Sequence, residues 1–390
     1  MTRFETSEAA PIRWGMVGGG RGSQIGYSHR SAALRDRTFE LLAGAFDIDA
    51  ERGRAFGREL GLDPARCYGD FAEMFSAEAA RPDGIRAVTI ATPNNTHHSI
   101  AKAALEQGLH VVCEKPLCFT VAEAEEVRRL SKEKGLIVGV TYGYAFYPMI
   151  EQARAMVEAG ELGDIRLVNL QFAHGFHSSA VEESDPAARW RVTPAFAGPS
   201  YVLGDLGTHP FYISQVILPR MRVTRLLCAR QSFVATRAPL EDNAVTLTQY
   251  DNGAFGTAWT SAVNAGSSHG QKVRIVGSHA SIEWWDERPN QLSFEVQGEP
   301  ARVLERGMGY LHPSARALDR ISTGHAEGLF EAWANMYRGL AQAIAASERG
   351  DAEALAAIRY PDVDAGVEGV RWVEACVRSA DAGGVWVDYR

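Results

Sequence analysis

Residues 12–26, IRWGMVGGGRGSQIG, decide the fold. A largely apolar run, which predicts a buried strand, leads directly into three consecutive glycines. A glycine turn between a strand and a helix lets backbone N–H groups approach a pyrophosphate. The G-x-G-x-x-G spacing starts with Gly18 and Gly20, and its last position is either Ser23 or, in a longer loop, Gly26. The cluster predicts a dinucleotide site, with a purely structural turn as the alternative.

An acidic residue ends the next apolar stretch. The sequence LLAGAFD, residues 41–47, ends in Asp47, which lies 29 residues after Gly18. A carboxylate at this place can accept hydrogen bonds from the adenosine ribose hydroxyls, and it repels a 2′-phosphate. Asp47 therefore favours NAD over NADP. The alternative is that Asp47 caps the following helix, but Asp49 is better placed for that role.

Strand-like and helix-like patterns alternate over the first 145 residues. Strands are expected at 12–18, 39–46, 87–91, 109–113 and 136–140. Helices are expected after the glycines through 30–34, and at 49–60, 96–107 and 121–134. This alternation predicts a parallel sheet with helices on both faces.

The rest of the chain has a different pattern. After a helix at 149–158, strand patterns follow one another with few helices between them, which predicts an α+β domain with a largely antiparallel sheet. The predicted domains are therefore 1–145 for cofactor binding and 146–390 for substrate binding and oligomerisation.

Composition limits the classes of function. The 390 residues are 46% hydrophobic and 23% charged, with a net charge of -8, so we expect a globular protein with no nucleic-acid or membrane partner. No apolar run reaches the roughly 20 residues that span a bilayer, and residues 1–10 lack the apolar core of a signal peptide. Five cysteines without a CxxC pair fit reduced thiols, so a cytoplasmic location is expected.

Several further stretches carry a family resemblance. They are IATPNNTH at 90–97, GLHVVCEKPL at 108–117, AGELGDI at 159–165, GDLGTH at 204–209 and GHAEGLFEAWANMY at 324–337. With them, nearly the whole chain resembles the Gfo/Idh/MocA oxidoreductases. The resemblance implies a Rossmann domain followed by an α/β domain with an open, mostly antiparallel sheet. It also implies dimers or tetramers formed through that sheet, and hydride transfer between NAD(P) and a secondary alcohol of a sugar or cyclic polyol.

The catalytic trio of the family corresponds here to Lys115, Asp205 and His209. The residue types suit the chemistry, because oxidation of an alcohol needs a base near neutral pH, and histidine is the usual one. Asp205 and His209 share a face if their stretch is helical. Lys115 follows a predicted parallel strand, where its ammonium group can stabilise negative charge on the reacting oxygen. A surface ion pair or half of a zinc site is the alternative for Asp205 and His209.

Other site residues are expected near the cofactor or the substrate. The cofactor candidates are Gly18, Gly20, Ser23, Gly26, Asp47, Thr92, Pro93, Asn94, His97 and Glu114, and the substrate candidates are Tyr144, His174, His177, Trp190, Arg191 and His325. The chain departs from its relatives at two positions of the expected pocket. Gly143 and Tyr144 stand where an arginine is usual, and Tyr212 replaces an acid.

These residues predict an NAD-dependent oxidoreductase acting on a cyclic polyol or sugar, either inositol-like or a pyranose. One alternative is an enzyme that oxidises a sugar transiently and recycles its NAD, as in glycoside elimination. Another is a non-catalytic NAD-binding regulator, which the presence of Lys115, Asp205 and His209 disfavours. The histidines lack the short ligand spacing of a zinc site, so no metal is expected.

Overall fold

In the computed structural model, residues 10–389 are described, except for the side chains of residues 186 and 187, and the chain divides into two compact units. Unit 1 contains the chain up to Thr141 together with Trp333–Glu368, and unit 2 contains Tyr142–Ala332 and the segment from Gly369 onward. The predicted division into 1–145 and 146–390 differs from these units, because it assigned residues 333–368 to the second domain.

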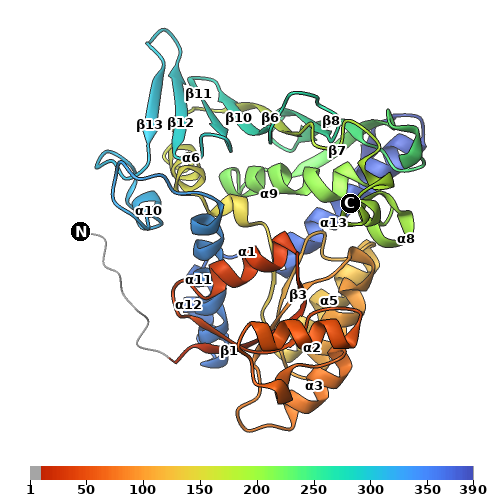
Figure 1. The fold of residues 1–390 in the computed structure, drawn as a ribbon. Helices are drawn as coiled ribbons and strands as arrows, with labels where there is room; N and C mark the ends of the chain where they lie inside the picture. The colour runs from red at the N-terminus through yellow and green to blue at the C-terminus, as the bar shows by residue number, and fades with distance from the viewer. Residues whose placement is uncertain (1–9, 390) are drawn as a thin grey trace. The chain divides into compact units, whose positions relative to one another are not determined.

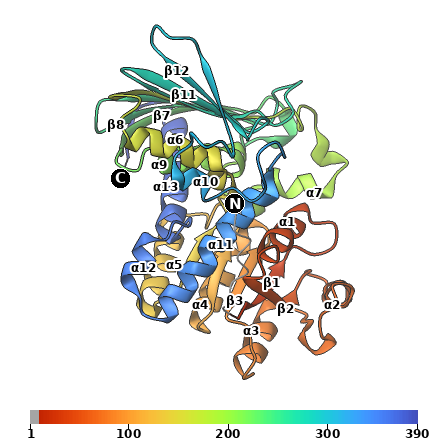
Figure 2. The same cartoon turned by 90° about the vertical axis from the view of Figure 1, so that its left-hand side faces the viewer.

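Unit 1 is built on a parallel sheet in the order β2-β1-β3-β4-β5. Its strands are β1 (Ile12–Gly18), β2 (Phe39–Ala45), β3 (Ala87–Ala91), β4 (His110–Cys113) and β5 (Val138–Val140). Its helices include α1 (Gln24–Ala33), α2 (Ala50–Glu59), α3 (Phe71–Ala79), α4 (His97–Glu106) and α5 (Val121–Lys134), which cover both faces (Figures 1 and 2). The direction of winding reverses between β1 and β3, and such a switch point is where open α/β sheets bind ligands.

A late segment of the chain completes unit 1. The methyl groups of Leu340, in α11 (Leu329–Glu348), fill the space beside Gly139 of β5, where a Cβ would come within 2.3 Å of them. The carbonyl of Pro361 accepts a hydrogen bond from Val140 N at 2.8 Å. These contacts with the edge strand are the physical reason why residues 333–368 belong to this unit.

Unit 2 contains a nine-stranded sheet in the order β13-β12-β11-β10-β6-β9-β8-β7-β14. The strands are β6 (Ile165–Ala173), β7 (Val223–Gln231), β8 (Asn243–Tyr250), β9 (Phe255–Ser261), β10 (Gln271–Gly277), β11 (Ala280–Trp285), β12 (Gln291–Val296), β13 (Arg302–Glu305) and β14 (Val387–Asp388). All neighbours pair antiparallel except β6 and β9, so the predicted open, mostly antiparallel sheet is confirmed.

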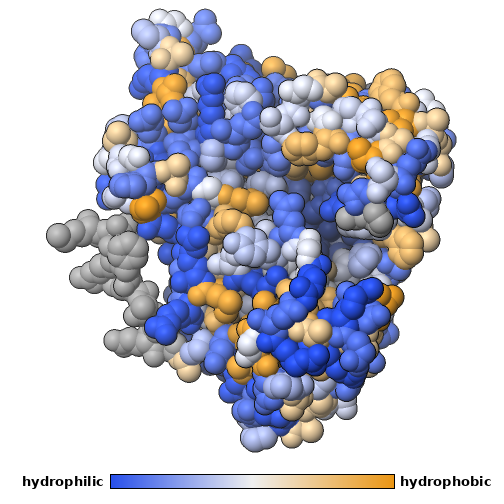
Figure 3. Space-filling view, viewed as in Figure 1, coloured by the Kyte–Doolittle hydropathy of each residue, from blue (hydrophilic) through white to orange (hydrophobic). Residues whose placement is uncertain are grey.

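One face of this sheet is covered by helices. They are α6 (Pro148–Glu158), α9 (Thr208–Ile217) and the later turns of α13 (Val363–Asp381) (Figures 1 and 2). Alternate residues of β8 point to the other face, where no helix of the described chain lies, and among them Val245 is 40% exposed. No helix within residues 10–389 is long and apolar enough to cross a membrane. On the surface drawn in Figure 3, hydrophobic residues form patches among hydrophilic ones.

Candidate functional site

The glycine turn after β1 is shaped by close backbone contacts. Gly18 has a φ of +76°, and a Cβ on it would lie 2.5 Å from the carbonyl oxygen of Ala91. A Cβ on Gly26, inside α1, would lie only 2.1 Å from the carbonyl oxygen of Gly19. Ser23 instead caps α1, because its Oγ accepts the N–H of Gly26 at 3.1 Å. Of the two predicted registers, Gly26 is therefore the position where helix and turn require a glycine.

On its other side, the same turn packs against Phe46, the residue directly after β2. A Cβ on Gly20 would lie 2.5 Å from the carbonyl oxygen of Phe46, so a side chain there would collide with backbone. Arg30 Nη1 donates to the carbonyl oxygen of Gly19 at 2.8 Å and fixes the turn from the side of α1. A turn of small residues at the start of a helix fits the pyrophosphate of a dinucleotide.

Asp47 lies just beyond β2, and its carboxylate is held in place. Its Oδ1 accepts the backbone N–H of Asp49 at 2.9 Å and Arg52 Nη2 at 2.9 Å. The hydrogen bond from Arg52 is the main reason why the pKa of Asp47 is lowered, so the carboxylate is ionised at neutral pH. Asp49 caps α2 by accepting Arg52 N, which removes capping as the role of Asp47. The side chain of Ile48 is fully exposed beside it, and no sequence motif pointed to this residue.

The loop after β3 carries Thr92, Pro93 and Asn94, as predicted from their order in the chain. His97 differs from its expected role. Its ring is completely buried, with Nδ1 2.9 Å from the carbonyl oxygen of Pro116 and Nε2 3.0 Å from that of Thr92. Because backbone carbonyls occupy both nitrogens, His97 braces the loop after β3 against the loop after β4, and a direct cofactor contact is not supported.

Glu114 and Lys115 follow β4 at the carboxyl end of the parallel sheet. Glu114 is buried and fixed to the neighbouring strand, because its N–H donates to the carbonyl oxygen of Ile90 at 3.0 Å. Its Oε1 lies 3.1 Å from His29 Nε2 and 2.6 Å from Thr141 Oγ1. Lys115 is partly exposed directly beside this carboxylate. Neither His29 nor Thr141 stood out in the sequence, because both come from distant segments.

In unit 2, Asp205 and His209 lie on one continuous helical stretch. Leu203–Gly207 is a π-helical turn that runs into α9, and such turns are frequent at functional sites. Arg191 Nε lies 3.5 Å from Asp205 Oδ2, and its guanidinium lies 4.5 Å from the centre of the Trp190 ring. Arg191, which stacks on Trp190, therefore lies beside Asp205, and the contact of Trp190 and Arg191 with a substrate stays a prediction.

His209 lies in a cluster of rings. Its ring centre is 4.9 Å from that of Tyr144 and 6.0 Å from that of Phe172. The same two rings also contact His269, at 5.6 Å and 4.5 Å. The Nδ1 atom of His269 lies 2.8 Å from Asp286 Oδ2, and its Nε2 lies 3.3 Å from the Tyr144 hydroxyl. The imidazoles of His209 and His269 therefore flank one aromatic pair, and no sequence motif pointed to His269.

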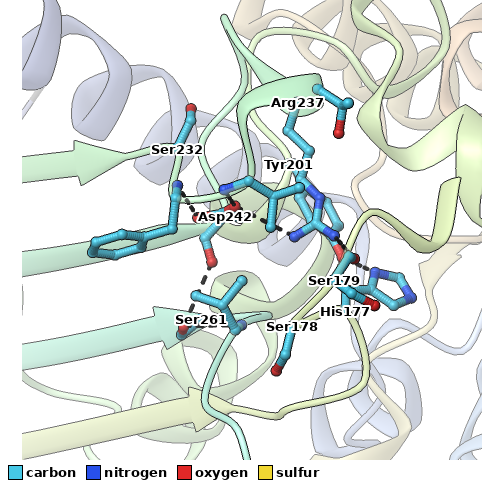
Figure 4. A network of polar contacts seen from close by, with 12 residues as sticks. His177, Ser178, Ser179, Tyr201, Ser232, Arg237, Asp242 and Ser261 are labelled. Atoms are coloured by element: carbon cyan, nitrogen blue, oxygen red, sulfur yellow. Dashed lines mark hydrogen bonds and ion pairs between the residues drawn. The ribbon is translucent and has the colours of Figure 1, made fainter. Parts of the chain in front are cut away.

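Two more candidate histidines lie on the loop after β6. Burial lowers the pKa of His174 to about 4 and also lowers the pKa of His177, whose Nδ1 contacts the Tyr201 hydroxyl. The buried guanidinium group of Arg237 holds this loop in place (Figure 4). Arg237 donates to the carbonyl oxygen of Ser179 at 2.6 Å and forms ion pairs with Glu182 and Asp242.

His325 is not part of this group. It is exposed, and among the described residues its contacts are Ser322 Oγ at 3.3 Å from its Nδ1 and Arg306 Nη2 at 2.6 Å from its backbone oxygen. The expectation that His325 binds substrate has no geometric support, since the turn around it is held by Arg306.

Comparison with known proteins identifies the relatives of the chain. Residues 12–142 match the NAD-binding Rossmann fold of the oxidoreductase family GFO_IDH_MocA, and residues 154–388 match its C-terminal alpha/beta domain. The chain is 59% identical to the uncharacterized oxidoreductase YfiI of Bacillus subtilis (strain 168), with 100% of each protein covered. A crystal structure of an inositol dehydrogenase homolog from Azotobacter vinelandii, complexed with NAD+, is 66% identical, with a TM-score of 0.98 and full coverage of both chains. Another crystal structure of an inositol dehydrogenase homolog from that organism, complexed with NADH and myo-inositol, is 66% identical, with a TM-score of 0.94 and 98% of each chain covered.

Proposed function

Because the chain belongs to the Gfo/Idh/MocA oxidoreductase family, we propose that it is an NAD-dependent dehydrogenase acting on an inositol-like cyclic polyol. The observation that carries this proposal is the match over 98% of the chain to a homolog complexed with NADH and myo-inositol. The polar groups gathered around His209 in unit 2 support it. Imidazole, phenol and carboxylate groups can together donate to and accept from several hydroxyls of one ring.

Each residue of the trio has a distinct role in the proposed reaction. His209 takes the proton of the reacting hydroxyl, since an imidazole is a suitable base near neutral pH. Asp205 binds a substrate hydroxyl and is itself oriented by Arg191, 3.5 Å away. Lys115 stabilises the negative charge that develops on the reacting oxygen.

The chain's own residues are suited to hold the dinucleotide. Gly18, Gly20 and Gly26 let the turn pack closely against neighbouring backbone, and such a glycine turn before a helix suits a pyrophosphate. The ionised Asp47 accepts hydrogen bonds from the adenosine ribose and disfavours a 2′-phosphate. Glu114 accepts hydrogen bonds at the nicotinamide end. Bound NAD supplies the acceptor for the hydride that leaves the substrate carbon.

The test is turnover with a panel of inositols and pyranoses, followed by the absorbance of NADH. We expect steady NADH release with an inositol, and we expect the Lys115→Ala variant to lose turnover while its NAD affinity stays within several-fold. Sugar conversion without net NADH would support the NAD-recycling alternative instead. NAD binding without turnover of any panel member would contradict the proposal.

We further propose that the uncovered face of the nine-stranded sheet binds a second copy of the chain. Val245 of β8 is 40% exposed and pairs with Trp259 of β9. Leu167, which is 43% exposed, lies on β6, the strand on the other side of β9. Exposed apolar side chains on central strands are typical of an interface. Light scattering should show a dimer or tetramer that Val245→Glu dissociates. A wild-type monomer at micromolar concentration would contradict this.

A further inference from the structure

A chain of buried polar groups in unit 1 leads to Glu114. It starts at Trp14, whose Nε1 donates to Thr89 Oγ1 at 3.0 Å, and Thr89 Oγ1 lies 3.0 Å from the Tyr337 hydroxyl. Tyr337 in turn lies 2.7 Å from His29 Nδ1, and His29 Nε2 lies 3.1 Å from Glu114 Oε1. All five side chains are buried. The turn of α11 that supplies Tyr337 belongs to the stretch 324–337, for which the proposed reaction has no use so far.

The chemistry of the two end groups fixes the direction of the hydrogen bond that each of them makes. An indole N–H can only donate, and an ionised carboxylate can only accept. Trp14 Nε1 therefore donates to Thr89 Oγ1, and Glu114 Oε1 accepts from His29. The Nε2 atom of His29 thus carries a proton, which points at Glu114 Oε1. These hydrogen bonds hold the Glu114 carboxylate in one orientation.

Because Glu114 is buried, its carboxylate needs hydrogen bonds to stay ionised. An ionised carboxylate removed from water is strongly disfavoured unless hydrogen bonds or charges compensate it. Burial alone would raise the pKa of Glu114, but the hydrogen bond and charge of His29, together with Lys115 and Thr141, lower it below its usual value. The groups that face Glu114 from the surrounding elements are His29 of α1, Thr141 after β5 and the neighbouring Lys115. The buried His97 of α4 lies close enough for the charge of Glu114 to raise its pKa, although burial lowers the pKa of His97 overall.

We propose that His29, held by Tyr337, is a positioning residue that fixes the Glu114 carboxylate for contact with the nicotinamide end of the cofactor. The inference rests on the proposed contact between Glu114 and NAD. The ring of His29 is also fixed by Trp333, with ring centres 5.0 Å apart. Trp333 and Tyr337 lie four residues apart on α11, so one face of this late helix holds the histidine.

The experiment measures NAD+ affinity against pH without any polyol, by fluorescence titration from pH 4 to pH 9. The variants are His29→Phe, which keeps a ring beside Trp333, and Tyr337→Phe, which removes only the hydroxyl. Loss of a hydrogen bond to a charged group corresponds to about one pKa unit. We expect the pH below which affinity falls to rise by about one unit in His29→Phe, and by less in Tyr337→Phe.

The matched control is His110→Phe, which replaces a buried histidine on β4 of the same unit. It should leave the pH dependence of NAD+ affinity unchanged. If His29→Phe folds, as judged by circular dichroism, and its pH dependence matches that of the wild type, the positioning role is refuted while the proposed function stands. If His29→Phe does not fold, Tyr337→Phe decides by the same criterion. If the wild type does not bind NAD+, the proposed function fails first and this inference fails with it.

Discussion

Replacing Arg237 by methionine would leave two carboxylates in the interior of unit 2 without their cation. Arg237 is fully buried, with Nη2 3.1 Å from Glu182 Oε2 and Nη1 3.3 Å from Asp242 Oδ2. The side chains of these acids are only 7% and 0% exposed. Removing one partner of a buried ion pair costs about 3–5 kcal/mol, because the remaining charge is uncompensated.

The structure places the expected loss toward the lower end of this range. Asp242 keeps two backbone donors, the N–H groups of Phe233 and Val234, each at 2.9 Å. Glu182 keeps the hydroxyl of Thr236. We therefore expect the free energy of unfolding of Arg237→Met to fall by about 3 kcal/mol at pH 7.

Urea denaturation followed by circular dichroism measures this difference. The matched control is Arg129→Met, because Arg129 forms an ion pair with Glu133 in which both side chains are 55% exposed. An exposed pair contributes less than about 1 kcal/mol, so the control should unfold close to the wild type. Equal effects of the two substitutions, or a loss below about 1 kcal/mol in Arg237→Met, would refute the reasoning.

The pH dependence of the same variant provides a second check. Burial opposes ionisation of Glu182, but the hydrogen bond and charge of Arg237 lower its pKa below the usual value. A carboxyl group whose pKa is lowered by folding contributes stability above the pKa of the unfolded chain, about 4.3, and this contribution is lost as the pH falls through the folded pKa. The difference between wild type and Arg237→Met should therefore narrow below about pH 4.

Gly26→Ala should weaken NAD affinity by at least about tenfold in a fluorescence titration, because its Cβ would lie 2.1 Å from the carbonyl oxygen of Gly19; unchanged affinity would contradict the assigned register. Asp47→Ala should lower the ratio of kcat/KM with NAD to that with NADP by about tenfold, and an unaltered ratio would remove Asp47 from the ribose site. Burial lowers the pKa of His110 to about 4, against about 6.5 in an unfolded chain, so the free energy of unfolding should fall by about 3 kcal/mol between pH 6.5 and pH 4. His110→Phe should flatten that decline, and an equally steep decline in the variant would contradict the assignment.

Local patterns were enough to predict most of the fold. The strands at 12–18 and 87–91 have the bounds expected from their apolar runs. The helix at 121–134 also has its expected limits, because Thr120 and Glu123 form a capping box and Gly135 ends it in the left-handed conformation. These signals lie within a few residues of the elements they define, so no knowledge of distant contacts is needed to interpret them.

Site residues could be predicted from the sequence only where one short segment contains a recognisable motif. Gly26 and Ser23 were indistinguishable by spacing, and only the approach of α1 to the carbonyl oxygen of Gly19 separates them. His269 lies in a polar loop that resembles any other turn, and its importance comes from Phe172, which lies almost a hundred residues away. No periodicity or motif encodes a contact of that range.

The same distance explains why the predicted domain division differs from the two compact units, and why the late motif had no assigned role. The stretch that contains Trp333 and Tyr337 has the 3.6-residue periodicity of an amphipathic helix, which predicts that one face is buried but not what buries it. Tyr337 on this face contacts His29, which lies some 300 residues earlier in the chain. Because Tyr337 completes a chain of hydrogen bonds that ends on Glu114, residues 333–368 are joined to the Rossmann sheet by a polar requirement as well as by packing. A domain division based on the order of elements along the chain separates residues 333–368 from the Rossmann sheet. A division based on the hydrogen bonds that support the buried Glu114 carboxylate keeps them together.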